Sequence, residues 1–262
     1  MKTTIANETV YFGTGSGQAE AEAPSIVFVH GAGFDHSVWV MPARYFARHG
    51  FQVVAPDLPG HGRSAGAPLE TIESMADWLT ELIRVLCGGK ATLVGHSMGS
   101  LAVLDCASRH GEVVDAIALL GTSAPMPVGP PLLDAARDGD HAAIDMANTW
   151  SHSSAGSLGM AGNPGMSNLY SGERWLERCS SAAYYADLAA CNAYSGEFDV
   201  EHTPSLIIAG TADRMTPARQ GGRVADALDN AATVLLPGCG HSMLSEQPNQ
   251  VLDALAEFIM RR

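Results

Sequence analysis

Short apolar runs alternate with longer amphipathic stretches through the first half of the chain. Each run is rich in β-branched residues, as is typical of a strand buried on both faces. These runs lie at residues 25–29, 51–57, 91–95 and 113–121. Helical periodicity fills the intervals at residues 39–50, 71–86 and 97–110. Strands that alternate with helices predict βαβ units and a mostly parallel sheet.

The strand pattern stops after Gly121 and returns near residue 203. Between these points, helix-like stretches at 131–150 and 172–194 flank a segment rich in Gly, Ser and Asn, which predicts a loop. Further strands and helices are then predicted at residues 204–210, 217–229, 232–238 and 248–260. We therefore expect one α/β core and one helical insertion. The core takes residues 1–121 and 203–262, and the insertion takes residues 122–202.

Composition narrows the class of protein. The chain has 262 residues, 46% of them hydrophobic, which is enough for one sizeable core. A formal charge of −13 disfavours binding to nucleic acid or to anionic lipid, and no apolar stretch is long enough to span a membrane. The first two dozen residues are polar, so we expect no secretory signal there, and five widely spaced cysteines without a CxxC pair favour a reducing compartment. We expect a cytoplasmic protein, and no pattern predicts its oligomeric state.

The stretch GHSMG at 95–99 lies between a predicted strand and a predicted helix. In that context a Gly-x-Ser-x-Gly sequence predicts a sharp turn that projects the Ser97 hydroxyl from the carboxyl edge of the sheet. Gly95 and Gly99 would leave room for the neighbouring strand and helix. The alternative is that Ser97 is an ordinary helix N-cap.

A nucleophilic serine needs a base and an acid. His241 follows the predicted strand at 232–238, and Asp213 follows the one at 204–210. Carboxyl ends of parallel strands share one edge of the sheet, so both side chains can approach Ser97. His241 could instead be a surface histidine. Asp57 also ends a strand, but we expect it to brace a turn.

Acyl transfer also needs donors for a developing oxyanion. The stretch HGAG at 30–33 ends the first buried strand, and the backbone N–H of Ala32 can face the site there. The second candidate donor is the N–H of Met98, at the positive end of the following helix. We expect His30 and His96 to support these turns rather than to take part in the chemistry.

Five separated motifs occur in a characteristic order. They are HGAG with Trp39 after it, DLPGHGRS at 57–64, GHSMGS at 95–100, GTADRMTP at 210–217 and GHSMLSEQP at 240–248. On these motifs, the chain resembles the α/β-hydrolase superfamily, in the branch with a helical cap, over nearly its whole length. The resemblance implies an eight-stranded, mostly parallel sheet flanked by helices, with the cap inserted after the sixth strand.

The resemblance also implies roles for individual residues. Ser97 would be the nucleophile, His241 the general base and Asp213 the orienting acid, with Ala32 and Met98 as oxyanion donors. Epoxide hydrolases and haloalkane dehalogenases of this fold use an aspartate where this chain has Ser97, so those activities are disfavoured.

The expected reaction is hydrolysis of small to medium carboxylic esters through an acyl-enzyme. The same triad could instead hydrolyse C–C bonds, open lactones, catalyse elimination or perhydrolyse acids, and some receptors bind ligands on this scaffold. We expect the substrate to contact a set of six residues: Gly31, Phe34, Trp150, Met160, Tyr170 and Met243.

We expect neither a cofactor nor a metal. No HExxH sequence and no His/Cys cluster is present, and Gly89-Lys90-Ala91 lacks the remainder of a phosphate loop. The stretch GTGSGQ at 13–18 lacks the third glycine of a dinucleotide fingerprint, and it predicts a hairpin turn.

Overall fold

The computed structural model describes residues 1–16, 22–159 and 167–261. Eight strands form one sheet in the order β1-β2-β4-β3-β5-β6-β7-β8. Their bounds are β1 Lys2–Ile5, β2 Glu8–Gly13, β3 Ser25–Val29, β4 Gln52–Pro56, β5 Ala91–His96, β6 Val114–Leu120, β7 Ser205–Gly210 and β8 Ala231–Leu236. Neighbours from β4 to β8 are parallel, whereas β2 pairs antiparallel with β1 and β4. The predicted eight-stranded, mostly parallel sheet is confirmed.

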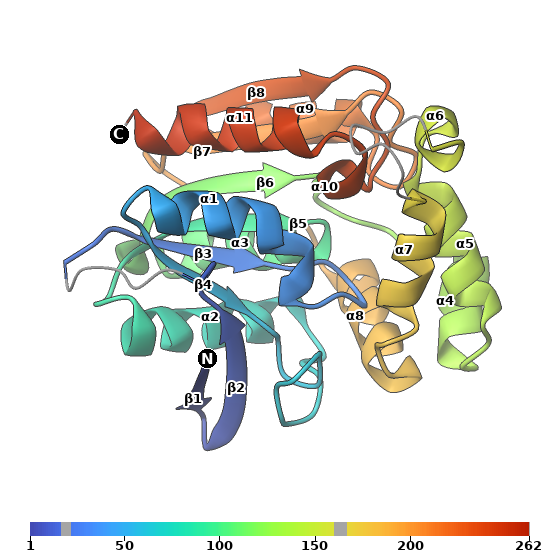
Figure 1. Cartoon of the computed structure of the whole chain (residues 1–262), viewed down its shortest axis with the longest axis horizontal. Coiled ribbons are helices and arrows are strands. Elements are labelled where there is room, and N and C mark those ends of the chain that lie inside the picture. The colour runs from blue at the N-terminus through green and yellow to red at the C-terminus, as the bar shows by residue number, and fades with distance from the viewer. Residues whose placement is uncertain (17–21, 160–166, 262) are drawn as a thin grey trace.

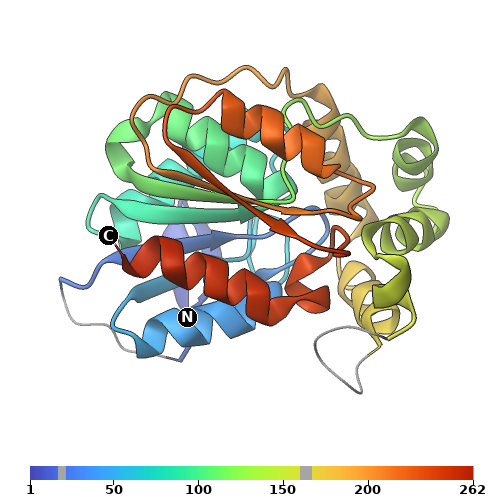
Figure 2. The same ribbon diagram turned by 90° about the horizontal axis from the view of Figure 1, so that it is seen from above.

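Helices cover both faces of this sheet (Figures 1 and 2). The core helices are α1 Val40–Arg48, α2 Ile72–Leu86, α3 Met98–Arg109, α9 Ala218–Asp226, α10 Met243–Glu246 and α11 Pro248–Met260. On one face, α1 and α11 bury Phe46 and Leu255 against the sheet residue Phe28. On the other face, α2, α3 and α9 bury residues such as Leu79 and Leu101. The fold is therefore a three-layer α/β/α structure.

The N-terminal hairpin differs from the prediction. Its turn lies at Ala6 and Asn7, both with positive φ, between two short strands whose polar residues face solvent. Gly13 still belongs to β2 and pairs with Ala55 of β4. Gly15 and Ser16 do form a turn, both with positive φ, but β2 and β3 are not paired with each other, so the predicted hairpin is wrong. Residues 17–18 lie outside the described residues.

Among the described residues, five helices lie between β6 and β7 in the chain. They are α4 Pro130–Arg137, α5 Ala142–Ser151, α6 Ser154–Ser157, α7 Asn168–Leu176 and α8 Ser181–Ala193, and we call them the inserted helices. They gather beyond the arrowheads of β3, β6 and β8, at the carboxyl edge of the sheet (Figure 1). Each predicted helical stretch is split in two, at Gly139 with φ +68 and before Ser180, whose side chain caps α8. The boundaries 1–121, 122–202 and 203–262 stay a prediction.

Over the described ranges, none of the helices has both the length and the apolar character needed to cross a bilayer. All five cysteines are free thiols.

Candidate active site

Ser97 occupies a strained turn between β5 and α3. Its φ of 53° and ψ of −123° are unusual for a residue with a side chain, and such strain costs about 1–3 kcal/mol. A Cβ on Gly95 would collide with the backbone of α3, and one on Gly99 would collide with the carbonyls of Val29 and His30. The Ser97 side chain makes no capping hydrogen bond to α3, so the turn differs from an ordinary N-cap.

Asp213 and His241 form a buried hydrogen-bonded pair at the ends of β7 and β8. The His241 Nδ1–H donates to Asp213 Oδ2 at 2.8 Å. The Thr216 hydroxyl donates to the same oxygen at 2.8 Å, and the N–H groups of Met215 and Thr216 donate to Oδ1 at 2.9 Å. Burial alone would raise the pKa of Asp213, but His241 and the Thr216 donors lower it overall, which keeps the carboxylate charged.

Two buried side chains hold the loop that carries His241. His96 Nε2–H donates to the His241 carbonyl at 2.9 Å, and burial lowers the pKa of His96 to about 3, so the ring is neutral. The Glu246 carboxylate accepts from Gly240 N–H at 3.2 Å and from Ser153 N–H at 3.0 Å. It also accepts from the Ser153 hydroxyl. Glu246 thus joins the loop that carries His241 to the start of α6.

In the HGAG turn after β3, two hydrogen bonds fix the carbonyl of Gly31. His30 Nδ1–H donates to the Gly31 carbonyl at 2.9 Å, and His30 Nε2 accepts from Leu58 N–H at 3.1 Å. Phe34 N–H also donates to the Gly31 carbonyl, at 3.2 Å. In a trans peptide the N–H points opposite to the C=O, so these bonds turn the Ala32 N–H away from His30. Burial lowers the pKa of His30 to about 4, which keeps this neutral tautomer.

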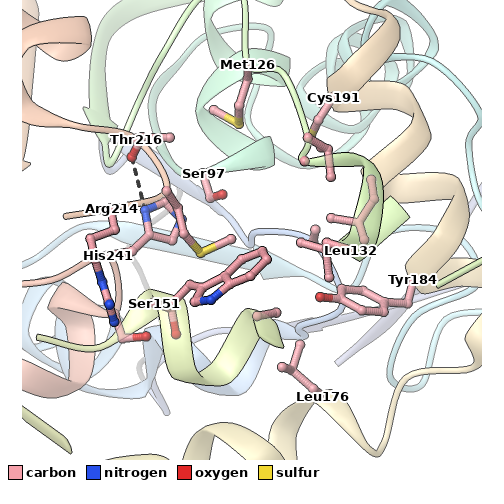
Figure 3. Close-up of a pocket in the computed structure, with 18 of the residues that line it drawn as sticks. Ser97, Met126, Leu132, Ser151, Leu176, Tyr184, Cys191, Arg214, Thr216 and His241 are labelled. Atoms are coloured by element: carbon pink, nitrogen blue, oxygen red, sulfur yellow. Dashed lines mark hydrogen bonds between the residues drawn. The ribbon is translucent and has the colours of Figure 1, made fainter. Parts of the chain in front are cut away.

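Ser97 and His241 open onto one cavity of about 460 Å³. Figure 3 shows His241, Arg214 and Ser151 on one side, Leu132, Leu176 and Tyr184 on the other, and Ser97 between them. The dashed line joins Thr216 Oγ1 to His241 Nδ1, 3.0 Å apart. The wall away from Ser97 is mostly apolar, so the cavity suits an uncharged, hydrophobic group beside the polar side chains of Ser97 and His241.

A match to a protein-family model identifies the family of the chain. The model described as "Alpha/beta hydrolase family" matches residues 26–254. The chain belongs to the alpha/beta hydrolase family. This confirms the resemblance to the α/β-hydrolase superfamily that the motifs indicated, because the family model spans most of the chain.

Several relatives of this alpha/beta hydrolase are hydrolases. A pimeloyl-[acyl-carrier protein] methyl ester esterase from Aromatoleum aromaticum is 31% identical over 91% of this chain and 98% of its own length. A 2-hydroxy-6-oxo-6-(2'-aminophenyl)hexa-2,4-dienoic acid hydrolase from Metapseudomonas resinovorans is 27% identical over 97% and 88%. The matches to two other curated relatives span 38% and 56% of those proteins.

Solved structures share the fold. An enol-lactonase from Burkholderia xenovorans LB400 has a TM-score of 0.86 at 23% identity, covering 99% of this chain and all of the other. A thermophilic esterase from Thermogutta terrifontis has a TM-score of 0.84 at 21% identity, covering 100% and 98%.

The structure of this alpha/beta hydrolase brings many of the predicted site residues together. Ala32, Phe34, Ser97, Trp150 and His241 line the cavity. Asp213 lies directly behind His241.

Two more predicted residues lie beside Ser97. Met98 is fully buried, but its N–H is at the first position of α3, where no helical carbonyl is available to it. Gly31 lies next to Ser97, since a Cβ on Gly31 would be 3.2 Å from the Ser97 Cβ.

Other predicted residues lie elsewhere. Tyr170 is 61% exposed and lies beside Arg174 on α7, on a surface depression separate from the cavity. Met243 is fully buried in the core between sheet and α11. Neither is among the described residues that line the cavity. Met160 lies outside the described residues.

Several lining residues were missed by the sequence reasoning: Met126, Leu132, Ser151, Leu176, Leu188, Cys191, Arg214 and Met215. Arg214 and Met215 had a usable signal, because they follow Asp213 directly. The others come from the inserted helices and from the segment that leads into them, where helical periodicity alone does not separate packing from pocket.

Two groups of side chains in the described part of the chain could offer metal ligands. They are Asp35, His36 and Asp57, and His141, Glu173 and Glu177. None of these six lines the cavity. The Asp57 carboxylate already accepts from His36 and from Arg63 N–H, as expected of a residue that braces a turn.

Proposed function

We propose that this protein is a serine hydrolase that cleaves small to medium carboxylic esters through an acyl-enzyme. The observation that carries the proposal is the buried Asp213–His241 pair, which shares one cavity with a serine at a strained turn. Serine hydroxyls are poor nucleophiles unless a base accepts their proton. In this arrangement the serine follows β5, the orienting carboxylate would follow β7 and the base would follow β8, at one edge of the sheet.

The geometry supports a role for each group. Because Nδ1 of His241 carries the proton that Asp213 accepts, Nε2 would be the nitrogen that takes the Ser97 proton. Ser97 Oγ would attack the ester carbonyl carbon while His241 Nε2 takes the Ser97 proton. The N–H groups of Ala32 and Met98 would bind the oxyanion. His241 would then protonate the leaving alcohol, and a water activated by His241 would release the acid and free Ser97.

The cavity supports the substrate class. Its apolar half is formed by side chains such as Leu132, Leu176 and Leu188, which favours an apolar acyl or alcohol group. Residues 122–202 would act as the cap over the reaction centre. The methyl ester esterase with 31% identity supports an ester substrate.

Hydrolysis of C–C bonds by the same triad is the second candidate. The dienoic acid hydrolase that aligns with 97% of this chain favours it. The same triad would also serve for lactone opening, elimination or perhydrolysis. A receptor that binds a ligand without turnover could retain it.

A panel of p-nitrophenyl esters of increasing chain length tests the proposal, with Ser97→Ala as the blank. We expect rates at least about 10³-fold above the blank for one range of chain lengths. Ester rates equal to the blank, with Ser97 still reactive toward a covalent probe, would favour C–C hydrolysis. Tight ligand binding without any turnover would favour a receptor.

A further inference from the structure

A buried ion pair joins inserted helix α8 to the loop after β4. His61, from the DLPGHGRS motif, places Nε2 at 2.9 Å from Asp187 Oδ2. Both side chains are almost fully shielded from solvent, with Asp187 at 0% exposure. The two residues are 126 positions apart in the chain, so the contact exists only in the folded protein.

Hydrogen bonds define the protonation state of His61. Its Nδ1 faces the Pro59 carbonyl at 3.0 Å, and its Nε2 faces the Asp187 carboxylate. Both partners only accept hydrogen bonds, so both ring nitrogens carry a proton. Burial alone would lower the pKa of His61, but the Asp187 charge and hydrogen bond raise it to about 11. His61 is therefore a buried imidazolium at neutral pH.

The same carboxylate oxygen reaches the HGAG turn. Asp187 Oδ2 accepts from Gly33 N–H at 2.8 Å. Gly33 has a φ of +73°, and a Cβ there would collide with Tyr184 and Leu176 from the inserted helices. Side chains of α8 and α7 thus pack directly against the HGAG turn at Gly33.

Hydrogen bonds with two side chains, His30 and Asp187, therefore fix the peptide groups before and after Ala32. His30 holds the Gly31 carbonyl, which belongs to the peptide that carries the Ala32 N–H. Asp187 holds the N–H of the next peptide, at Gly33. With both peptides fixed, the direction of the Ala32 N–H is fixed as well, because each peptide group is planar.

Folding stability alone does not explain the arrangement. Asp187 Oδ1 is buried and makes no hydrogen bond to any described residue. Buried polar atoms are satisfied in the large majority of cases, and burying a charge pair is seldom better than packing apolar side chains. The pair therefore points to a requirement of the site.

We propose that Asp187 is a positioning residue that aims the Ala32 N–H at the oxyanion. His61 orients the Asp187 carboxylate through their ion pair. This inference rests on the proposed function, since it needs an oxyanion to form beside Ser97. It makes the oxyanion turn dependent on a carboxylate supplied by the inserted helices.

The test compares three substitutions of Asp187 with a matched control. Asp187→Ala removes the acceptor. Asp187→Asn keeps an oxygen for Gly33 N–H without the charge, and Asp187→Glu keeps the charge but moves it by one methylene. The control is Asp145→Ala, because Asp145 forms a His–Asp pair with His141 at 3.4 Å on the exposed surface. Each variant is assayed for kcat, for KM and for binding of a trifluoromethyl ketone, which Ser97 converts into a tetrahedral oxyanion.

We expect Asp187→Ala to lower kcat by about 30–300-fold, as removal or misplacement of an oxyanion donor does, with KM within about 3-fold of the parent. Affinity for the ketone should fall by the same factor as kcat/KM. Asp187→Asn should stay within about 5-fold of the parent, and Asp187→Glu should lose about 10-fold or more in kcat. The Asp145→Ala control should match the parent.

Two outcomes would overturn the inference. One is parent-like kcat and ketone affinity in Asp187→Ala. The other is a loss confined to KM or to folding, which is the signature of a purely structural contact. If Asp187→Ala does not fold, the Asn and Glu variants decide: equal activity in both would refute positioning by this oxygen. Failure of the proposed function is distinguishable, because the parent protein itself would then neither turn over esters nor bind the ketone covalently.

Discussion

Three buried histidines with different protonation states should shape the pH dependence of folding stability. Burial lowers the pKa of His30 to about 4 and that of His96 to about 3, so both are neutral in the folded protein. Asp187 raises the pKa of His61 to about 11, so this ring stays charged. In the unfolded chain all three titrate near 6.5.

The signs follow from proton linkage. Below pH 6.5 the unfolded chain binds protons at His30 and His96 that the folded protein does not, so stability falls on acidification. Above pH 6.5 the folded protein retains the His61 proton that the unfolded chain loses, so stability falls as pH rises toward 11. With a slope of about 1.4 kcal/mol per pH unit for each histidine, acidification from 6.5 to 5 costs about 3 kcal/mol. Raising the pH from 6.5 to 8.5 costs about 2 kcal/mol.

Urea unfolding at pH 5, 6.5 and 8.5 measures this dependence. We expect a maximum near pH 6.5, and we expect Asp187→Asn to flatten only the alkaline side, because it removes the charge that holds the His61 proton. Stability that is unchanged or rises between pH 6.5 and 8.5 would refute a charged His61. The groups around the ring are Asp187, His30 and Cys179, and the first of these dominates.

Three further substitutions test single contacts. Asp213→Asn should lower kcat by about 10⁴-fold with little effect on KM, because an amide favours the wrong His241 tautomer; a loss under about 10-fold contradicts the assigned acid. Glu246→Ala should lower the free energy of unfolding by about 3–5 kcal/mol in urea denaturation, because it leaves three buried donors unpaired; a loss below about 1 kcal/mol contradicts the bracing role. Gly99→Ala should cost about 1–3 kcal/mol by the same assay, because its Cβ meets backbone carbonyls. Gly111→Ala has open space around its Cβ and should be close to neutral, so equal effects at both glycines would refute the steric argument.

The parallel sheet was predictable because its strands are short apolar runs. Residues 25–29 and 91–95 are such runs, and they form β3 and most of β5. The N-terminal hairpin was not predictable in this way, since β1 is mostly polar and buries only Ile5, and β2 buries only Val10 and Phe12. Its turn at Ala6 and Asn7 depends on two residues with positive φ rather than on a glycine.

The placement of Ser97, Asp213 and His241 at one edge of the sheet was predictable from strand ends, because the topology of a parallel sheet brings their carboxyl termini to one edge. The buried Asp187 was not predicted, although a signal exists. It lies on α8 between Tyr184 and Leu188, three residues after one and one residue before the other, and both are buried apolar or aromatic side chains. An acid on the buried face of a helix requires a partner, but that partner, His61, comes from a distant loop that only the fold brings close.

Tyr170 was predicted to contact the substrate, but the structure places it on the surface. It belongs to a helix in the predicted insertion, but it lies on the exposed side of α7. Residue type alone does not tell the cavity side of an inserted helix from its outer side. That choice depends on how α4, α5, α7 and α8 pack together.

Covalent labelling with a fluorophosphonate tests the central claim most directly, namely that the Asp213–His241 pair activates Ser97. Intact-mass measurement of the native protein should show one adduct, and peptide mapping should place it on Ser97. Ser97→Ala should gain no mass, and His241→Ala should label at least about 10³-fold more slowly. Absence of labelling in the native protein, or an adduct on any other residue, would contradict the account.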